Sequence, residues 1–131
     1  MLAQTIQTNE LLIEKIETIA KWLAEKKAKH IVALDIREFG SITDVLMIAS
    51  GVNIRHNQAL ADWILEKISE KRWEYLGMEG YKVGNWILID LNEIIVHIFL
   101  EETREFYNIE GLWRKAKEID LNLGDINNDN G

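Results

Sequence analysis

Residues 45–50, VLMIAS, constrain the fold of this chain more than any other segment. Five of these six residues are apolar, and the run is bounded by Asp44 and Gly51, so its length fits a strand and not a buried helix. A strand with apolar side chains on both faces belongs in the middle of a sheet that is covered on both sides. The segment therefore predicts a sheet enclosed between helices.

The flanking segments supply the other elements. Apolar residues recur every three or four positions in 9–29, 53–71 and 101–118, which predicts three helices. Segments 30–36, 85–91 and 93–100 are rich in β-forming residues, whereas 74–84 contains three glycines and is expected to be irregular. We therefore expect a single-domain α/β fold with one mixed sheet covered by helices.

Residues 86–100 are predicted to form a hairpin with a two-residue loop at 91–92. In this register Trp86 lies opposite His97, and side chains alternate between the two faces. One face is wholly apolar and is assigned to the core: Ile87, Ile89, Ile94, Val96 and Ile98.

The opposite face of the hairpin combines an aromatic and apolar centre with an acidic rim. Its members are Trp86, Leu88, Asp90, Glu93, Ile95, His97 and Phe99. Such a mixture is typical of a binding surface. Two alternatives stay open: a helix covers this face and Trp86 is ordinary core, or a one-residue bulge exchanges the two faces.

The composition excludes several classes of function. Lys and Arg number 15 against 22 Asp and Glu, a net charge of −7, whereas non-specific nucleic-acid binding needs a cationic surface. The chain has no cysteine, which excludes thiolate chemistry and disulfides. No apolar run is long enough to cross a membrane, and the first residues lack the pattern of a signal peptide. We expect a soluble, intracellular protein.

Residues that could carry out catalysis are dispersed along the chain. The three histidines lie far apart and lack metal-ligand spacing, and the aspartates fall on different elements, without the paired carboxylates of two-metal phosphoryl transfer. An anion could dock at Ser50-Gly51, before a helix, although a tight turn explains this dipeptide as well. We expect no catalytic residue, metal or cofactor.

The start of the last predicted helix adds charged and aromatic side chains beside the hairpin. Glu101 and Glu102 have a structural explanation, because acids in a first helical turn interact favourably with the helix dipole. Arg104 and Tyr107 are residue types that are common in interfaces.

Two long segments resemble the ribosomal silencing factors, also called the Iojap family. They are 35–62 (DIREFGSITDVLMIASGVNIRHNQALAD) and 76–113 (LGMEGYKVGNWILIDLNEIIVHIFLEETREFYNIEGLW). The resemblance covers about residues 9–118, and its most specific parts are SITD, ASG followed by RH, LGxEG, WILID and VHIFLEETREFY. The chain departs from the family at 45–46, where an aromatic residue is common, and in its Asn-rich end.

The resemblance implies a nucleotidyltransferase-like fold without catalytic carboxylates. It also implies a cytoplasmic, non-enzymatic repressor that binds the large ribosomal subunit through its fourteenth protein, blocks joining of the small subunit and silences translation when nutrients are short. The acidic net charge suits a basic ribosomal protein as partner. A homodimer stays open, and neither direct DNA binding nor a membrane partner is expected. The competing hypotheses are a nucleotidyltransferase-like enzyme and a dimeric module unrelated to ribosomes.

We assign partner binding to the mixed face of the hairpin and to the start of the last helix. The assigned residues are Trp86, Leu88, Ile95, His97, Phe99, Glu101, Glu102, Arg104 and Tyr107. Residues 1–119 are assigned to the silencing-factor domain. Residues 120–131 are acidic and Asn-rich, and we expect a disordered tail there.

Overall fold

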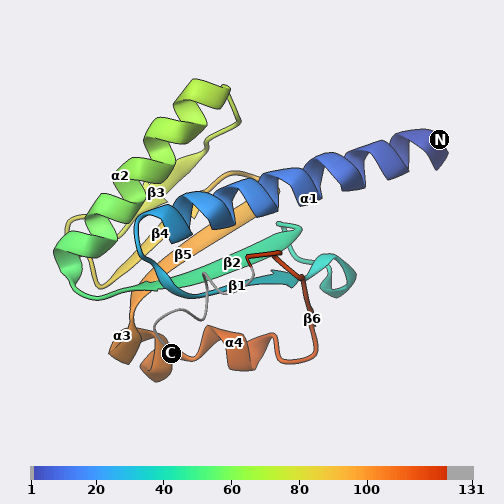
Figure 1. Cartoon of the computed structure of the whole chain (residues 1–131). Coiled ribbons are helices and arrows are strands. Elements are labelled where there is room, and N and C mark those ends of the chain that lie inside the picture. Colours follow the sequence, from blue (N-terminus) through green and yellow to red (C-terminus); the bar gives the residue numbers. More distant parts are fainter. Residues whose placement is uncertain (1, 124–131) are drawn as a thin grey trace.

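The computed structural model describes the backbone of residues 2–123 and the side chains of residues 10–123. Figure 1 shows helices packed on both faces of one sheet. The elements, in chain order, are α1 (Leu2–Glu25), β1 (Lys29–Asp35), the 3-10 turn η1 (Arg37–Phe39), β2 (Val45–Gly51), α2 (Ile54–Lys71), β3 (Gly77–Glu79), β4 (Trp86–Asp90), β5 (Ile94–Leu100), α3 (Glu101–Tyr107), α4 (Ile109–Leu112) and β6 (Lys117–Glu118).

The sheet has the strand order β3-β4-β5-β2-β1-β6. β2 and β5 are parallel, and the other neighbouring strands are antiparallel. All seven residues of β2 are buried, which confirms the central covered strand expected from residues 45–50. The predicted mixed α/β sheet between helices is also confirmed.

The main core lies between the sheet and the two long helices, on what we call the α1/α2 face. Both helices contribute apolar stripes with a spacing of three or four residues, as the sequence predicts. The apolar face of the hairpin is buried against them, which confirms its assignment to the core. The central members of this core are Ile16, Ile19, Leu23, Leu60, Ile64, Ile87, Ile89, Ile94, Val96 and Ile98.

The turn between β2 and α2 is held by internal hydrogen bonds. The Val52 N–H donates to His56 Nδ1 at 2.9 Å, and His56 Nε2 lies 2.7 Å from the Lys26 carbonyl at the end of α1. Gly51 leaves room for the buried Asn57, because a Cβ at position 51 would lie 2.0 Å from Asn57 Oδ1 and would force that side chain to move. These contacts support the interpretation of Ser50-Gly51 as a tight turn.

The predicted register of the hairpin is wrong by two residues. Trp86 lies opposite Phe99, because the turn lies one residue further along the chain than predicted: a hydrogen bond of 2.9 Å from the Leu91 N–H to the Ile94 carbonyl encloses Asn92 and Glu93. Asn92 in this turn has a left-handed φ of 77°, a conformation that Asn tolerates. A shift of two keeps every side chain on its predicted face.

The prediction of one helix over 101–118 is also wrong. Asn108, with a left-handed φ of 47°, separates two short helices. α3 ends just before it at Tyr107, and α4 begins just after it at Ile109 in a new direction. The chain then forms β6 on the free edge of β1. A second core forms on this opposite side of the sheet, which we call the α3/α4 face. It consists of Leu34, Ile36, Leu46, Ile48 and Phe99, with Ile109, Trp113 and Ala116 packed against it.

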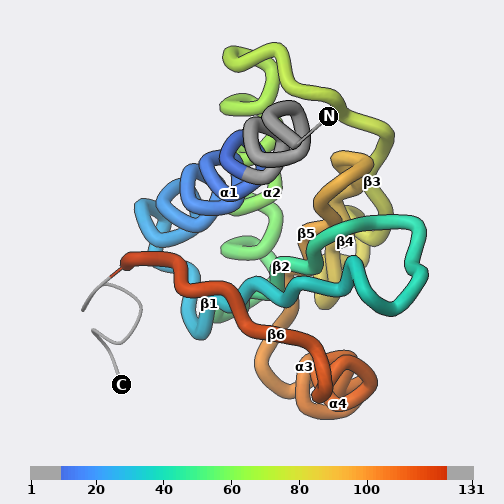
Figure 2. Tube along the Cα trace, turned by 90° about the vertical axis from the view of Figure 1, so that its right-hand side faces the viewer, coloured from blue at the N-terminus to red at the C-terminus, as the bar shows by residue number. Residues whose placement is uncertain are grey.

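The packed part of the chain extends beyond the boundary expected at residue 119. Leu121 and Leu123 are each only 7% exposed and belong to the main core, and Asn122 Nδ2 donates to Glu17 Oε2 of α1 at 2.7 Å. Figure 2 shows the chain after α4 running along β1 toward α1. Residues 120–123 are therefore part of the body, and the rest of the expected tail, 124–131, lies outside the described residues.

This packing makes the end of the body a contributor to stability. Replacement of Leu123 by Ala should lower the free energy of unfolding by about 2 kcal/mol or more, because it empties a buried leucine site. Leu112, 79% exposed, is the matched control, and Leu112→Ala should change the free energy of unfolding by less than about 0.5 kcal/mol. Urea denaturation measures both. Equal, small effects would show that residues 120–123 do not stabilise the domain.

His97 is buried on the α3/α4 face beside Trp86. It is 7% exposed, its Nδ1 accepts a hydrogen bond of 3.0 Å from Trp86 Nε1, and burial lowers its pKa from 6.5 to about 4. An indole N–H can only donate, so this hydrogen bond requires an unprotonated Nδ1. His97 is therefore neutral at pH 7.

Stability should consequently fall as the pH drops from 6.5 toward 4. Over this interval the unfolded chain binds a proton at His97 that the folded protein does not, which should cost about 2 kcal/mol between pH 7 and pH 5. Urea denaturation at the two pH values measures the loss, which should be much smaller in His97→Gln and persist in His30→Gln. An unchanged loss in His97→Gln would contradict the assignment.

Candidate partner-binding site

The α3/α4 face is open over β4 and the adjoining part of β5. Trp86, Leu88 and Ile95 are only half-buried there, and Tyr107, 51% exposed, contacts Trp86 from the end of α3. These four residues are called the aromatic surface below. Their position resolves the alternatives that the sequence left open: the second core covers one part of this face and leaves the other part accessible.

Trp86 is the most constrained member of the aromatic surface. Its ring stacks on Phe99, with centroids 4.9 Å apart and planes 26° from parallel, and the Tyr107 ring lies 4.9 Å away on a 45° tilt. The indole N–H is bound to His97. Stacking and a hydrogen bond fix the orientation of the ring, so an anchor of this kind loses little conformational entropy on binding.

Carboxylates lie beside the aromatic surface. Glu79 and Asp90 share the sheet face of Leu88 and Ile95, because they are the respective cross-strand partners of these residues. α3 carries a further exposed acid, Glu102, at the edge of the sheet where β2 and β5 end. The expected position of Glu93 on this rim is wrong, since Glu93 bonds to Lys15 of α1 at 2.8 Å.

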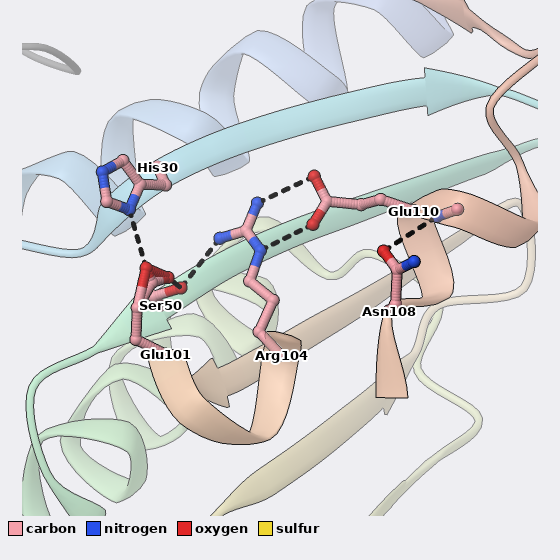
Figure 3. Close-up of polar contacts among 7 residues, drawn as sticks. His30, Ser50, Glu101, Arg104, Asn108 and Glu110 are labelled. Atoms are coloured by element: carbon pink, nitrogen blue, oxygen red, sulfur yellow. Dashed lines mark hydrogen bonds and ion pairs between the residues drawn. The ribbon is translucent and has the colours of Figure 1, made fainter. Parts of the chain in front are cut away.

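A polar network of α3 side chains connects β1 and the end of β2 to α4 (Figure 3). Arg104 donates through Nε and Nη2 to the two carboxylate oxygens of Glu110, at 2.8 and 3.1 Å, and through Nη1 to Ser50 Oγ at 2.8 Å. Ser50 Oγ donates in turn to Glu101 Oε1 at 2.7 Å, and the other oxygen of Glu101 lies 3.1 Å from His30 Nδ1.

The network keeps Glu101 ionised. Burial raises the pKa of its carboxyl, whereas the hydrogen bond from Ser50 and the neighbouring charges of His30 and Arg104 lower it, and the lowering contributions prevail. The Glu101 carboxylate therefore already has internal partners, and Glu102 beside it is the more available of the two acids.

A cavity of about 460 Å³ opens at this edge of the sheet, where the parallel strands β2 and β5 end. Its lining includes Lys29, His30, Ser50, Glu101 and Glu102. In α/β sheets such an edge often holds a ligand. Among the residues that the structure describes, no group of three His, Asp or Glu side chains could hold a metal ion, and no helix is long and apolar enough to cross a membrane.

The structure divides the nine predicted site residues into three groups. The aromatic surface unites four of them, and Glu101 and Glu102 lie at the cavity. His97, Phe99 and Arg104 are buried, at 7%, 0% and 7% exposure, so they do not offer a contact surface. Alternation along a strand predicts the face of a residue, but not that α3 and α4 fold back over part of that face.

The partners of Arg104 could not be predicted from the sequence. Glu110 and Ser50 lie 6 and 54 residues away from it in sequence, and their contact depends on the break at Asn108. The only local signal is Asn108 itself. Helices often end in a residue with left-handed conformation, and Asn is second only to Gly at such positions.

Comparisons with known proteins agree with this architecture. A family model described as "Ribosomal silencing factor during starvation" matches residues 9–130, so the match includes the Asn-rich end that the resemblance left outside. The ribosomal silencing factor of Halalkalibacterium halodurans is 32% identical over 108 residues, which cover 82% of this chain and 92% of that protein. That of Bacillus subtilis is 34% identical over 100 residues, covering 76% of this chain and 85% of that protein.

Solved structures extend the agreement to the fold. The crystal structure of a protein from Chromobacterium violaceum superposes with a TM-score of 0.74 at 30% identity and covers 86% of this chain and 93% of that chain. A crystal structure from Bacillus halodurans superposes with a TM-score of 0.71 at 32% identity and covers 86% of this chain and 99% of that chain. Sequence and fold agree over most of its length, and the chain therefore belongs to the family of ribosomal silencing factors, which act on the ribosome to silence translation.

Proposed function

We propose that this chain binds the large ribosomal subunit through its fourteenth protein and sterically blocks joining of the small subunit, which silences translation under nutrient limitation. The observation that carries the proposal is the aromatic surface, an open apolar patch with a fixed Trp86 in a chain of this family. A mouse relative, 27% identical over 101 residues that are 44% of its length, is named for assembly of the mitochondrial ribosomal large subunit.

The chemistry of the site supports a basic protein as partner. The aromatic surface supplies a rigid anchor of a residue type that dominates interface energies, and Glu79 and Asp90 add negative charge beside it. Glu102 adds a further negative charge at the cavity. Complementary charge of this kind raises the association rate and selects the partner. We propose that the chain acts in the cytoplasm by occupying its binding site, without enzymatic activity; its oligomeric state there is a separate question.

Replacement of Trp86 by Ala should weaken binding to purified large subunits by about thirtyfold, or ~2 kcal/mol, because it removes the anchor of the aromatic surface. Co-sedimentation measures the dissociation constant. Trp63→Ala is the matched control: Trp63 is also half-buried but lies on α2, with Lys26 and Lys67 over its ring, and its loss should leave binding unchanged.

Trp86 also contacts Phe99, so its replacement is checked against unfolding. Leu88→Gln provides a second variant, with a side chain that is half-exposed and outside the ring cluster. Binding that is unchanged in both variants, with both folded at the assay temperature, would show that the aromatic surface is not the binding site.

Steric blocking makes a prediction about stoichiometry. Added to separated subunits, the protein should lower the yield of joined ribosomes in proportion to the large subunits that it occupies, with saturation near one copy per large subunit. Sucrose gradients measure the yield. Loss of joining that grows with time at a small fraction of one copy would indicate an enzyme and contradict occupancy.

A further inference from the structure

Arg104 is a buried cation whose partners come from both sides of a helix break. It lies on α3 and holds Glu110 of α4 through two hydrogen bonds and Ser50 of β2 through a third, while it is only 7% exposed. The ion pair spans six residues and encloses the turn at Asn108. Arg104 thus joins two short helices and the sheet at one point, as Figure 3 shows.

The turn inside this ion pair is closely determined. Asn108 donates its backbone N–H to the Arg104 carbonyl at 2.8 Å, and its side-chain oxygen accepts from the Gly111 N–H at 3.2 Å. Gly111 cannot carry a side chain without movement, since a Cβ there would lie 2.4 Å from Asn108 Nδ2. Tyr107 immediately precedes Asn108, so the direction of its side chain depends on this turn.

We propose that Arg104 is a positioning residue of the binding site: its ion pair with Glu110 clamps α3 to α4 and thereby holds Tyr107 against Trp86. The clamp fixes the position of Tyr107 in the aromatic surface of the free protein, before a partner binds. The proposal rests on the proposed function, because it gives Arg104 an effect on partner binding without a contact to the partner.

The chemistry of the pair fits a geometric role. Burial of the Arg104 guanidinium carries a desolvation cost that offsets much of its attraction to the partly exposed Glu110, so stability alone is a weak reason for an arginine here. The guanidinium fork, however, binds both oxygens of one carboxylate in a single orientation, which an ammonium group cannot do. Two parallel hydrogen bonds fix the angle between α3 and α4 as well as their distance.

The test is a double-mutant cycle with Glu110→Gln and Tyr107→Leu, measured as binding to purified large subunits. Glu110→Gln keeps the size of the side chain and breaks the charge pair. It should raise the dissociation constant about tenfold in the natural chain and less than twofold in the Tyr107→Leu background, because both changes disturb the same contact. Glu118→Gln is the matched control, an exposed acid on β6 that carries the same change in charge and should alter neither value.

A second measurement does not involve the ribosome. The indole N–H of Trp86 should give an NMR resonance that is sensitive to the Tyr107 ring, because the centroids of the two rings lie 4.9 Å apart. This resonance, assigned with Trp86→Phe, should shift in the free Glu110→Gln protein and stay in place in Glu118→Gln. Arg104→Lys, which retains the charge and loses the fork, should shift it as well.

The outcomes separate the clamp from the proposed function. A Trp86 resonance that is unmoved by Glu110→Gln, or a tenfold effect of Glu110→Gln that persists in the Tyr107→Leu background, would overturn the clamp and leave the binding site intact. If Tyr107→Leu leaves binding unchanged while Trp86→Ala weakens it, the clamp is overturned and the binding site stands. If Trp86→Ala and Leu88→Gln also leave binding unchanged, the aromatic surface is not the site and both proposals fail.

Discussion

The parallel pairing of β2 with β5 is the interaction on which the rest of the structure depends. The two strands pair over seven residues in the middle of the sheet, and every residue of β2 is buried. Because they are parallel, both end at the same edge, where α2 leaves toward one face of the sheet and α3 toward the other (Figure 1). This divergence creates the two cores and brings Ser50, at the end of β2, within reach of Arg104 on α3.

The two faces of the sheet differ in how completely helices cover them. The α1/α2 face is closed by two long helices and contains most of the core. The α3/α4 face is covered by two short helices, which bury Phe99 and leave Trp86 half-exposed beside it. One stacked pair therefore belongs to the interior through Phe99 and to the surface through Trp86, so the packing of the second core also positions the aromatic surface.

Patterns that depend on burial could be predicted from the sequence. The apolar run of β2 and the alternation of Ile87, Ile89 and Val96 identify the central strand and the core face, because side-chain period follows directly from backbone geometry. Single-residue backbone conformations could not. The left-handed Asn92 lies in the hairpin turn, which is displaced by one residue from its predicted position and so shifts the strand register by two. The left-handed Asn108 breaks the last predicted helix into α3 and α4.

For the candidate site, the sequence predicts which side chains share a face of the sheet, but not which of them are buried. Trp86, Leu88 and Tyr107 fall on one surface, as strand alternation and interface composition suggest. Arg104 carries the same interface signal but is buried, because Glu110 reaches it only after the chain has turned back at Asn108. The likeness of the chain to its relatives identifies its family, whereas the location of each side-chain contact requires the three-dimensional arrangement.

Site-specific photocrosslinking tests the central claim, that the aromatic surface faces the ribosome, most directly. A photoreactive phenylalanine analogue at the exposed Phe106, next to Tyr107, should crosslink to the fourteenth protein of the large subunit, whereas the same analogue at Trp63 on α2 should not. Efficient crosslinking from position 63 and none from position 106, with both proteins bound to the subunit, would contradict the account.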